Sequence, residues 1–208
     1  MADALLHNGN PAGNYYDKYN ASNPIARKLM QGFFTTVSGF AKQTGERVVH
    51  EVGCGEGHLS AILHGQGFTV RGSDVSAEII DVARAQSAGL GTDIKFKTAG
   101  VEALRAPLDS APLVVCCEVL EHLEDPESAL GRLSELAAPY LILSVPREPL
   151  WRLLNMCRGR YLSALGNTPG HLQHWSTSAF VKMIARHVDI IDVATPVPWT
   201  VALCKSRS

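Results

Sequence analysis

The chain carries almost no net charge. Its 208 residues include 19 basic and 20 acidic side chains, which gives a formal net charge of -1. This balance disfavours nucleic acid as a partner, because a surface that binds phosphates needs a basic excess. Any anionic ligand must therefore meet a local group of cationic side chains.

Long apolar runs and paired cysteines are also missing. No window approaches the roughly 20 uninterrupted apolar residues of a membrane span, and the first residues, MADALLHNGNPAGN, lack the basic and apolar segments of a secretion signal. The five cysteines form no C-x-x-C pair and lie mostly within apolar runs, which predicts reduced, buried thiols. These features predict a soluble cytoplasmic protein and leave its oligomeric state open.

The composition fits one globular domain. With 46% hydrophobic residues, a chain of this length can bury roughly 70% of its unfolded surface in one core. Residues 1–22 are polar and rich in Asn, Gly and Tyr, which predicts a flexible arm. Residues 23–208 contain no internal repeat or low-complexity linker and are expected to form a single domain.

Strand-like and helix-like segments alternate along this domain. A cap-like Asn23-Pro24 precedes the first helical pattern, and β-type runs follow in RVVHEVG, FTVRGSD, DIKFKTA, PLVVCCE and YLILSVP. Helical patterns such as SAEIIDVARAQSAG and PESALGRLSELAAP separate them, which predicts a doubly wound α/β fold with a parallel sheet. The last segment, VDIIDVATPVPWTVALCK, predicts a hairpin at the sheet edge.

The most specific motif follows the first strand, in VVHEVGCGEGHLSAIL. Gly53, Gly55 and Gly57 have G-x-G-x-G spacing, so the backbone can approach a ligand closely before a helix begins. About 20 residues later Asp74 ends the second strand, where an acid can bind ribose hydroxyls. The pattern predicts an adenosyl cofactor but fits NAD poorly, because the third glycine comes one residue too early for G-x-G-x-x-G.

These residues resemble the class I S-adenosylmethionine-dependent methyltransferases, through Glu51-Val-Gly-Cys-Gly-Glu-Gly57 and the terminal strand pair. VVCCEVLEHLEDPESAL and SVPREPLWRLLN are similar to the ubiquinone-biosynthesis O-methyltransferases. The resemblance implies a Rossmann-like, seven-stranded, mostly parallel sheet with an antiparallel last strand, and S-adenosylmethionine as cofactor. The cofactor contacts that it implies are Glu51, Gly53, Gly55, Gly57, Asp74, Val75, Val101, Glu102 and Glu118.

The segment EVLEHLEDP contains a second candidate site. In a helical turn Glu118, Glu121 and His122 would share one face, and E-x-x-E-H resembles the metal-binding segment of small-RNA 2′-O-methyltransferases. His171, or His174 in its place, is expected to complete a divalent site. Carboxylates favour Mg²⁺ or Mn²⁺, and imidazoles keep Zn²⁺ and Fe²⁺ as candidates. The alternative is a metal-free site in which His122 or His171 is the general base and Glu118 assists.

Two further segments are candidates for substrate contact. REPLWRLLNMCRGRYLSALGN contains Arg147, Trp151 and Arg152 in the region expected to form a lid, and the arm contains Tyr16 and Tyr19. The mixture of apolar and basic side chains predicts an anionic or amphiphilic small-molecule acceptor, or contact with a membrane surface. An ordinary amphipathic helix with a solvated basic face explains the same pattern.

The function predicted from these motifs is methyl transfer from S-adenosylmethionine to a small molecule, with oxygen favoured as the acceptor atom. A divalent ion is expected to assist the transfer. A metal-independent N- or C-methyltransferase with a histidine base is one alternative. A methyltransferase of RNA termini is another, disfavoured by the balanced charge. A cofactor-binding module without catalysis is the third.

Overall fold

A computed structural model describes residues 6–7, 10–11 and 23–207. One seven-stranded sheet has the order β5-β4-β3-β6-β7-β9-β8. Its strands are β3 (Val48–Val52), β4 (Thr69–Asp74), β5 (Lys95–Thr98), β6 (Ala111–Cys117), β7 (Ala137–Pro146), β8 (Val188–Ala194) and β9 (Trp199–Ser206). Neighbours from β5 to β7 are parallel, and β9 is antiparallel to both β7 and β8. The predicted sheet and its reversed last strand are confirmed. In the predicted hairpin, β8 is the edge strand.

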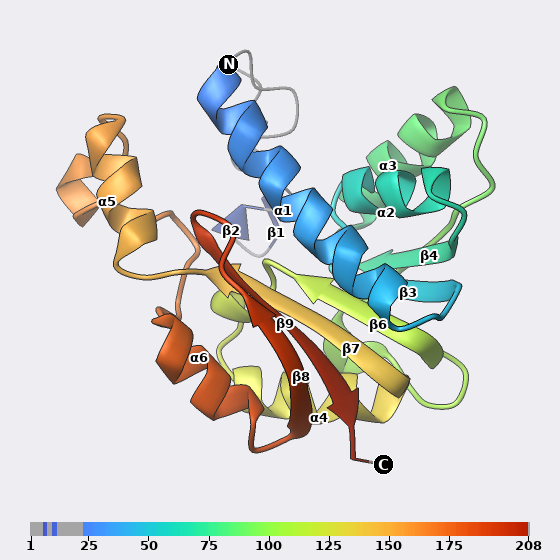
Figure 1. The fold of residues 1–208 in the computed structure, drawn as a ribbon. Coiled ribbons are helices and arrows are strands. Elements are labelled where there is room, and N and C mark those ends of the chain that lie inside the picture. The colour runs from blue at the N-terminus through green and yellow to red at the C-terminus, as the bar shows by residue number, and fades with distance from the viewer. Residues whose placement is uncertain (1–5, 8–9, 12–22, 208) are drawn as a thin grey trace.

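Helices cover both faces of the sheet (Figure 1). They are α1 (Pro24–Gln43), α2 (His58–Gly65), α3 (Ala77–Gly89), α4 (Pro126–Leu136), α5 (Leu150–Cys157) and α6 (Thr177–Ile184), with 3-10 turns η1 (Val101–Ala103), η2 (Leu120–His122) and η3 (Leu162–Ala164). Two short strands, β1 (Leu6–His7) and β2 (Asn10–Pro11), pair with each other. The helix starts follow from side-chain caps, since Asn23 and Asp125 accept hydrogen bonds from backbone N–H groups and a proline follows each.

The two faces of the sheet belong to two apolar clusters. On β6, Leu113 and Val115 pack with α1 and α2, while Val114 and Cys116 pack with α4 and α6. Successive strand residues point to opposite faces, so a strand covered by helices on both sides reads as one apolar run. The run PLVVCC is therefore explained by burial on both faces.

The cysteines are free thiols, as the sequence predicts. Cys54, Cys116 and Cys204 are buried, and burial raises the pKa of Cys204 to about 12. The prediction of burial is wrong for Cys157, which lies exposed at the end of α5. Among the described helices, none combines the length and the apolar character needed to cross a membrane.

Candidate active site at the carboxyl ends of the strands

The loop between β3 and α2 is built for close backbone approach. Gly53 has φ +76°, and its N–H donates to Ser73 O on β4 at 2.7 Å. A Cβ on Gly53 would lie 2.1 Å from Cγ2 of Val119, which follows β6. Only glycine therefore fits here, and the glycine loop lies directly against the turn after β6.

Asp74 ties the glycine loop to the end of β4. Its Oδ2 accepts from Gly55 N at 3.0 Å and its Oδ1 accepts from Ser76 N at 3.1 Å. Burial raises the pKa of Asp74, and these backbone donors oppose the rise. Since each carboxylate oxygen has a second acceptor site, these bonds leave room for ribose hydroxyls.

Glu51 lies beneath the same loop and is only 4% exposed. Burial raises the pKa of Glu51 to about 8, although the Ser60 hydroxyl donates to its carboxylate and opposes the rise. A carboxyl group with this pKa is largely protonated at neutral pH. A cationic ligand at this edge would favour its ionised form.

The segment after β5 lies beside the residue that follows β4 and borders the same edge of the sheet. Val75 is 50% exposed and lies near Gly100, while the Glu102 side chain is also exposed. The side chain of Val101 is 4% exposed and belongs to the core cluster with α4. Any ligand contact from Val101 must therefore come from its backbone.

Glu118 follows β6 but does not belong to the helical turn. It has a left-handed backbone, φ 60°, and η2 begins only at Leu120. Its Oε1 accepts from Ser144 Oγ at 3.1 Å and its Oε2 accepts from Trp199 Nε1 at 2.7 Å. The sequence predicts that Glu118 shares a helix face with Glu121 and His122. That shared face does not form, because Glu118 lies before the turn.

Three of the predicted metal ligands do come together. One ligating atom from each of Glu121, His122 and His171 lies within 4.8 Å of the others. Glu121 and His171 are buried, whereas His122 is exposed. One carboxylate and two imidazoles form a donor set that suits a divalent transition metal.

Backbone hydrogen bonds hold this group in place across 50 residues of sequence. Leu172 N and Gln173 N both donate to Glu121 O, at 2.8 and 3.0 Å. His122 Nδ1 lies 2.9 Å from Gly170 O. Because a carbonyl only accepts, Nδ1 carries the hydrogen and the neutral ring has its lone pair on Nε2.

His174, which the sequence offers in place of His171, lies outside this group of three. Its Nε2 is 2.7 Å from Asn167 Oδ1. His171 instead has its ring 4.9 Å from that of His122 and 5.9 Å from that of Trp151.

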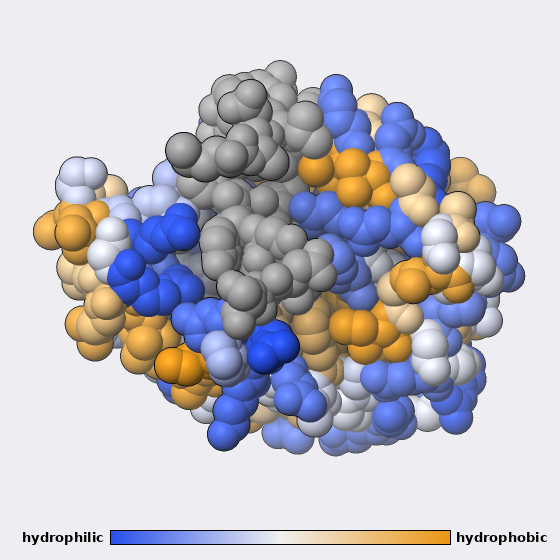
Figure 2. Space-filling model, turned by 90° about the horizontal axis from the view of Figure 1, so that it is seen from above, coloured by the Kyte–Doolittle hydropathy of each residue, from blue (hydrophilic) through white to orange (hydrophobic). Residues whose placement is uncertain are grey.

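The predicted lid is α5 and the segment after it, which project from the sheet (Figure 1). Trp151 donates to Thr168 Oγ1 at 2.9 Å, and Arg152 Nε donates to Leu165 O at 3.0 Å. Figure 2 shows hydrophobic surface in this projecting region beside hydrophilic residues. The exposed large side chains there include Leu153, Leu162 and Leu165.

Arg147 connects the lid to the sheet, because its N–H donates to Pro198 O at 2.9 Å. Its side chain is half-buried. Tyr16 and Tyr19 lie outside the described residues, so their role in substrate contact stays a prediction.

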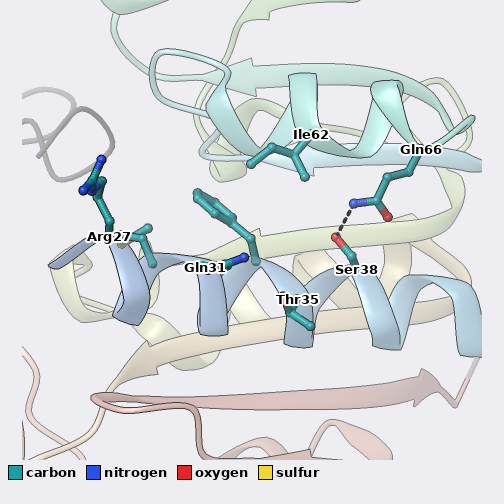
Figure 3. A pocket seen from close by; sticks show the side chains of 8 residues that line it. Arg27, Gln31, Thr35, Ser38, Ile62 and Gln66 are labelled. Atoms are coloured by element: carbon teal, nitrogen blue, oxygen red, sulfur yellow. Dashed lines mark hydrogen bonds between the residues drawn. The ribbon is translucent and has the colours of Figure 1, made fainter. Parts of the chain in front are cut away.

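A separate groove of about 330 Å³ lies between α1 and α2 (Figure 3). Within it Gln66 Nε2 donates to Ser38 Oγ at 3.1 Å. The lining residues are Arg27, Met30, Gln31, Phe34, Thr35, Ser38, Ile62 and Gln66. None of the side chains of the candidate site lines it.

The sequence did not indicate Ser144 and Trp199, which both donate to Glu118. They lie on β7 and β9, 26 and 81 residues from Glu118 along the chain. No local motif marks either residue. Predicting them from the sequence would have required the strand order and the register of β7 and β9.

Comparisons with known proteins point to methyltransferases. Residues 49–140 match the sequence model of a family described as a methyltransferase domain. A ubiquinone biosynthesis O-methyltransferase from Cupriavidus pinatubonensis is 36% identical over 131 residues, which cover 62% of this chain and 51% of that protein. Another from Coxiella burnetii, strain RSA 493, is 27% identical over 190 residues, 84% of this chain and 76% of that protein.

A solved structure extends the likeness to the fold. Magnesium protoporphyrin IX methyltransferase from Synechocystis PCC 6803, with bound S-adenosylhomocysteine (SAH), has a TM-score of 0.68 and 21% identity. The match covers 89% of this chain and 88% of that one. The chain spans about half the length of the Cupriavidus relative.

Proposed function

Since this chain carries a class I S-adenosylmethionine-dependent methyltransferase domain, we propose that it transfers the methyl group of S-adenosylmethionine to a hydroxyl oxygen of a small molecule. The proposal depends most on the group formed by Glu121, His122 and His171. A hydroxyl attacks a sulfonium methyl group well only when its proton is removed or its pKa is lowered, and this group can do either. The names of the two curated relatives support oxygen as the acceptor atom.

The cofactor site in this proposal is the edge formed by the glycine loop and Asp74. The glycine loop lets a ligand approach its backbone closely, and Asp74 offers a carboxylate next to Gly55. Methyl transfer needs the nucleophile, the methyl carbon and the sulfur in line at about 3 Å. The chain's main contribution is therefore to hold both reactants at the edge of the sheet.

We propose further that Glu121, His122 and His171 hold one divalent ion. The donor set fits, because its three ligating atoms converge and the Nδ1 hydrogen of His122 is fixed by Gly170 O. A bound ion would lower the pKa of the acceptor hydroxyl. With Glu118 hydrogen-bonded to Trp199, two nitrogens and one oxygen remain, which shifts the expected ion from Mg²⁺ towards Mn²⁺, Fe²⁺ or Zn²⁺.

A metal-free enzyme with a histidine base is the second candidate. The exposed His122 favours it, since the hydrogen bond from Nδ1 leaves the lone pair of a neutral ring on Nε2. Such an enzyme would methylate oxygen, nitrogen or carbon without an ion. RNA termini are the least favoured acceptor, given the net charge of -1.

One experiment separates these candidates. The protein is incubated with methyl-labelled S-adenosylmethionine and a panel of catechols, aliphatic alcohols, amines and short RNAs, with added Mn²⁺, Mg²⁺ or Zn²⁺ and separately with a chelator. The proposal expects label on a hydroxyl oxygen of a small molecule, lost on chelation. Label on nitrogen or carbon that survives chelation supports the histidine base, and label on RNA supports that alternative. Cofactor binding without transfer to any acceptor contradicts the proposed function.

Asp74→Ala is expected to weaken S-adenosylmethionine binding by about 1–3 kcal/mol, because it leaves ribose hydroxyls without a charged acceptor and releases the Gly55 N–H. Isothermal titration calorimetry measures the change. Asp93→Ala is the matched control, since the Asp93 side chain is 89% exposed and pairs with His64. Equal affinity in wild type and Asp74→Ala would limit Asp74 to capping and loop support.

Replacing Arg147 and Arg152 together by alanine is expected to raise the KM of the acceptor about tenfold and to change cofactor affinity less than about twofold. The reason is that both residues belong to the lid and its attachment, away from the glycine loop. Steady-state kinetics with calorimetry of cofactor binding test this. Arg132→Ala on α4 is the control. A parallel loss of both affinities would indicate misfolding instead of lost acceptor binding.

A further inference from the structure

The backbone at Glu118 is held in an uncommon conformation. Its φ of 60° lies in the left-handed region, which non-glycine residues rarely adopt and which costs about 1 kcal/mol or more. Its N–H donates to Ser144 O at 3.2 Å, so β7 fixes the backbone of this residue. Such strain persists only where the surroundings hold it, and this position borders the glycine loop.

The carboxylate of Glu118 is held as firmly as its backbone. Ser144 Oγ donates to one oxygen and Trp199 Nε1 donates to the other at 2.7 Å. A hydrogen bond to a charged acceptor is about twice as strong as one between neutral groups. Two donors on two different strands therefore fix the direction of the negative charge.

Trp199 has little freedom to move. It is 3% exposed, and its ring lies 4.9 Å from that of Phe33 on α1 and 5.8 Å from that of Trp151 on α5. Trp151 stacks in turn on His171 of the candidate metal group. The indole that binds Glu118 is thus held by contacts with α1 and α5.

Glu118 also lies beside the cofactor loop. Val119, the next residue, contacts Gly53 so closely that a Cβ there would overlap its side chain. S-adenosylmethionine carries a positive sulfonium, whereas the sulfur of SAH is neutral. A carboxylate held close to that sulfur would favour S-adenosylmethionine over SAH.

We infer that Trp199 is a positioning residue, which holds the Glu118 carboxylate so that it stabilises the sulfonium of bound S-adenosylmethionine. The inference rests on the proposed use of this cofactor. It adds a role for the reversed strand β9, because the first residue of that strand orients a charge at the end of β6.

The test is the ratio of the affinities for S-adenosylmethionine and SAH, measured by calorimetry. Trp199→Phe retains an aromatic ring and removes the N–H donor, and it is expected to lower the ratio about tenfold, mainly through weaker S-adenosylmethionine binding. Glu118→Gln is expected to lower the ratio similarly. In the double variant the ratio falls no further, because both changes remove one interaction.

The control is Trp175→Phe, since Trp175 packs against Phe180 on the other face of the sheet. It is expected to leave the ratio unchanged. Equal losses for both ligands in Trp199→Phe, or independent effects in the double variant, overturn the inference. If Trp199→Phe fails to fold, an unchanged ratio in Glu118→Gln overturns it. The binding ratio needs no turnover, so absence of methyl transfer in wild type would count against the proposed function alone.

Discussion

Glu121→Ala is expected to lower the kcat for methyl transfer by about 10²- to 10³-fold and to leave S-adenosylmethionine affinity within about twofold of wild type. Glu121 supplies the only carboxylate in the group of three, and its side chain is 1% exposed. Loss of one ligand disables an ion site as a unit. The glycine loop and Asp74, which the proposal assigns to the cofactor, lie at the ends of β3 and β4, whereas Glu121 follows β6. Chelation of the wild-type protein is expected to have the same effect, with restoration by Mn²⁺, Fe²⁺ or Zn²⁺.

Two further variants separate the loss of the charge from the loss of packing and from a surface effect. Glu121→Gln retains the shape of the buried side chain and tests the charge without creating a cavity. Glu135→Ala is the surface control, because Glu135 pairs with Arg132 on the exposed side of α4. Bound metal is measured by mass spectrometry of the dialysed proteins. Full turnover after exhaustive chelation would reject the ion and leave His122 as the candidate base.

The proposed cofactor edge is predictable because its sequence signals are local. Gly53 follows β3 and Asp74 ends β4, and parallel strands bring their carboxyl ends to one edge. The positions of these residues relative to their strands are therefore enough to predict that they lie close together. The two-faced burial of β6 is predictable for the same reason, since it appears as one apolar run.

The acidic segment after β6 is harder to predict, because one backbone angle changes which side chains share a face. Helical spacing joins Glu118 to Glu121, but the left-handed Glu118 precedes η2 and turns towards Trp199. The partners of Glu118 come from β7 and β9, whose contact with β6 depends on strand order and register. His171 joins Glu121 through backbone bonds between two loops, which no spacing rule encodes.

Glu51→Gln is expected to become more stable relative to wild type as the pH rises, by about 3–5 kcal/mol between pH 4.5 and pH 8.5 in the absence of cofactor. The pKa of Glu51 is raised from its ordinary 4.5 to about 8 in the folded protein, chiefly by burial. Above pH 4.5 the unfolded chain ionises this group while the folded protein keeps it protonated. Ionisation therefore favours the unfolded state until the pH passes the folded pKa, and glutamine lacks this penalty.

Urea unfolding of both proteins at several pH values measures the difference in the free energy of unfolding. The neighbouring His50 titrates in the opposite sense, because burial lowers its pKa to about 4 and stability from this group is lost as the pH falls below about 6.5. That loss is common to both proteins and cancels in the difference. Glu135→Gln, at an exposed position on α4, is the surface control. A difference between Glu51→Gln and wild type that stays constant from pH 4.5 to pH 8.5 would show that Glu51 ionises normally in the folded protein.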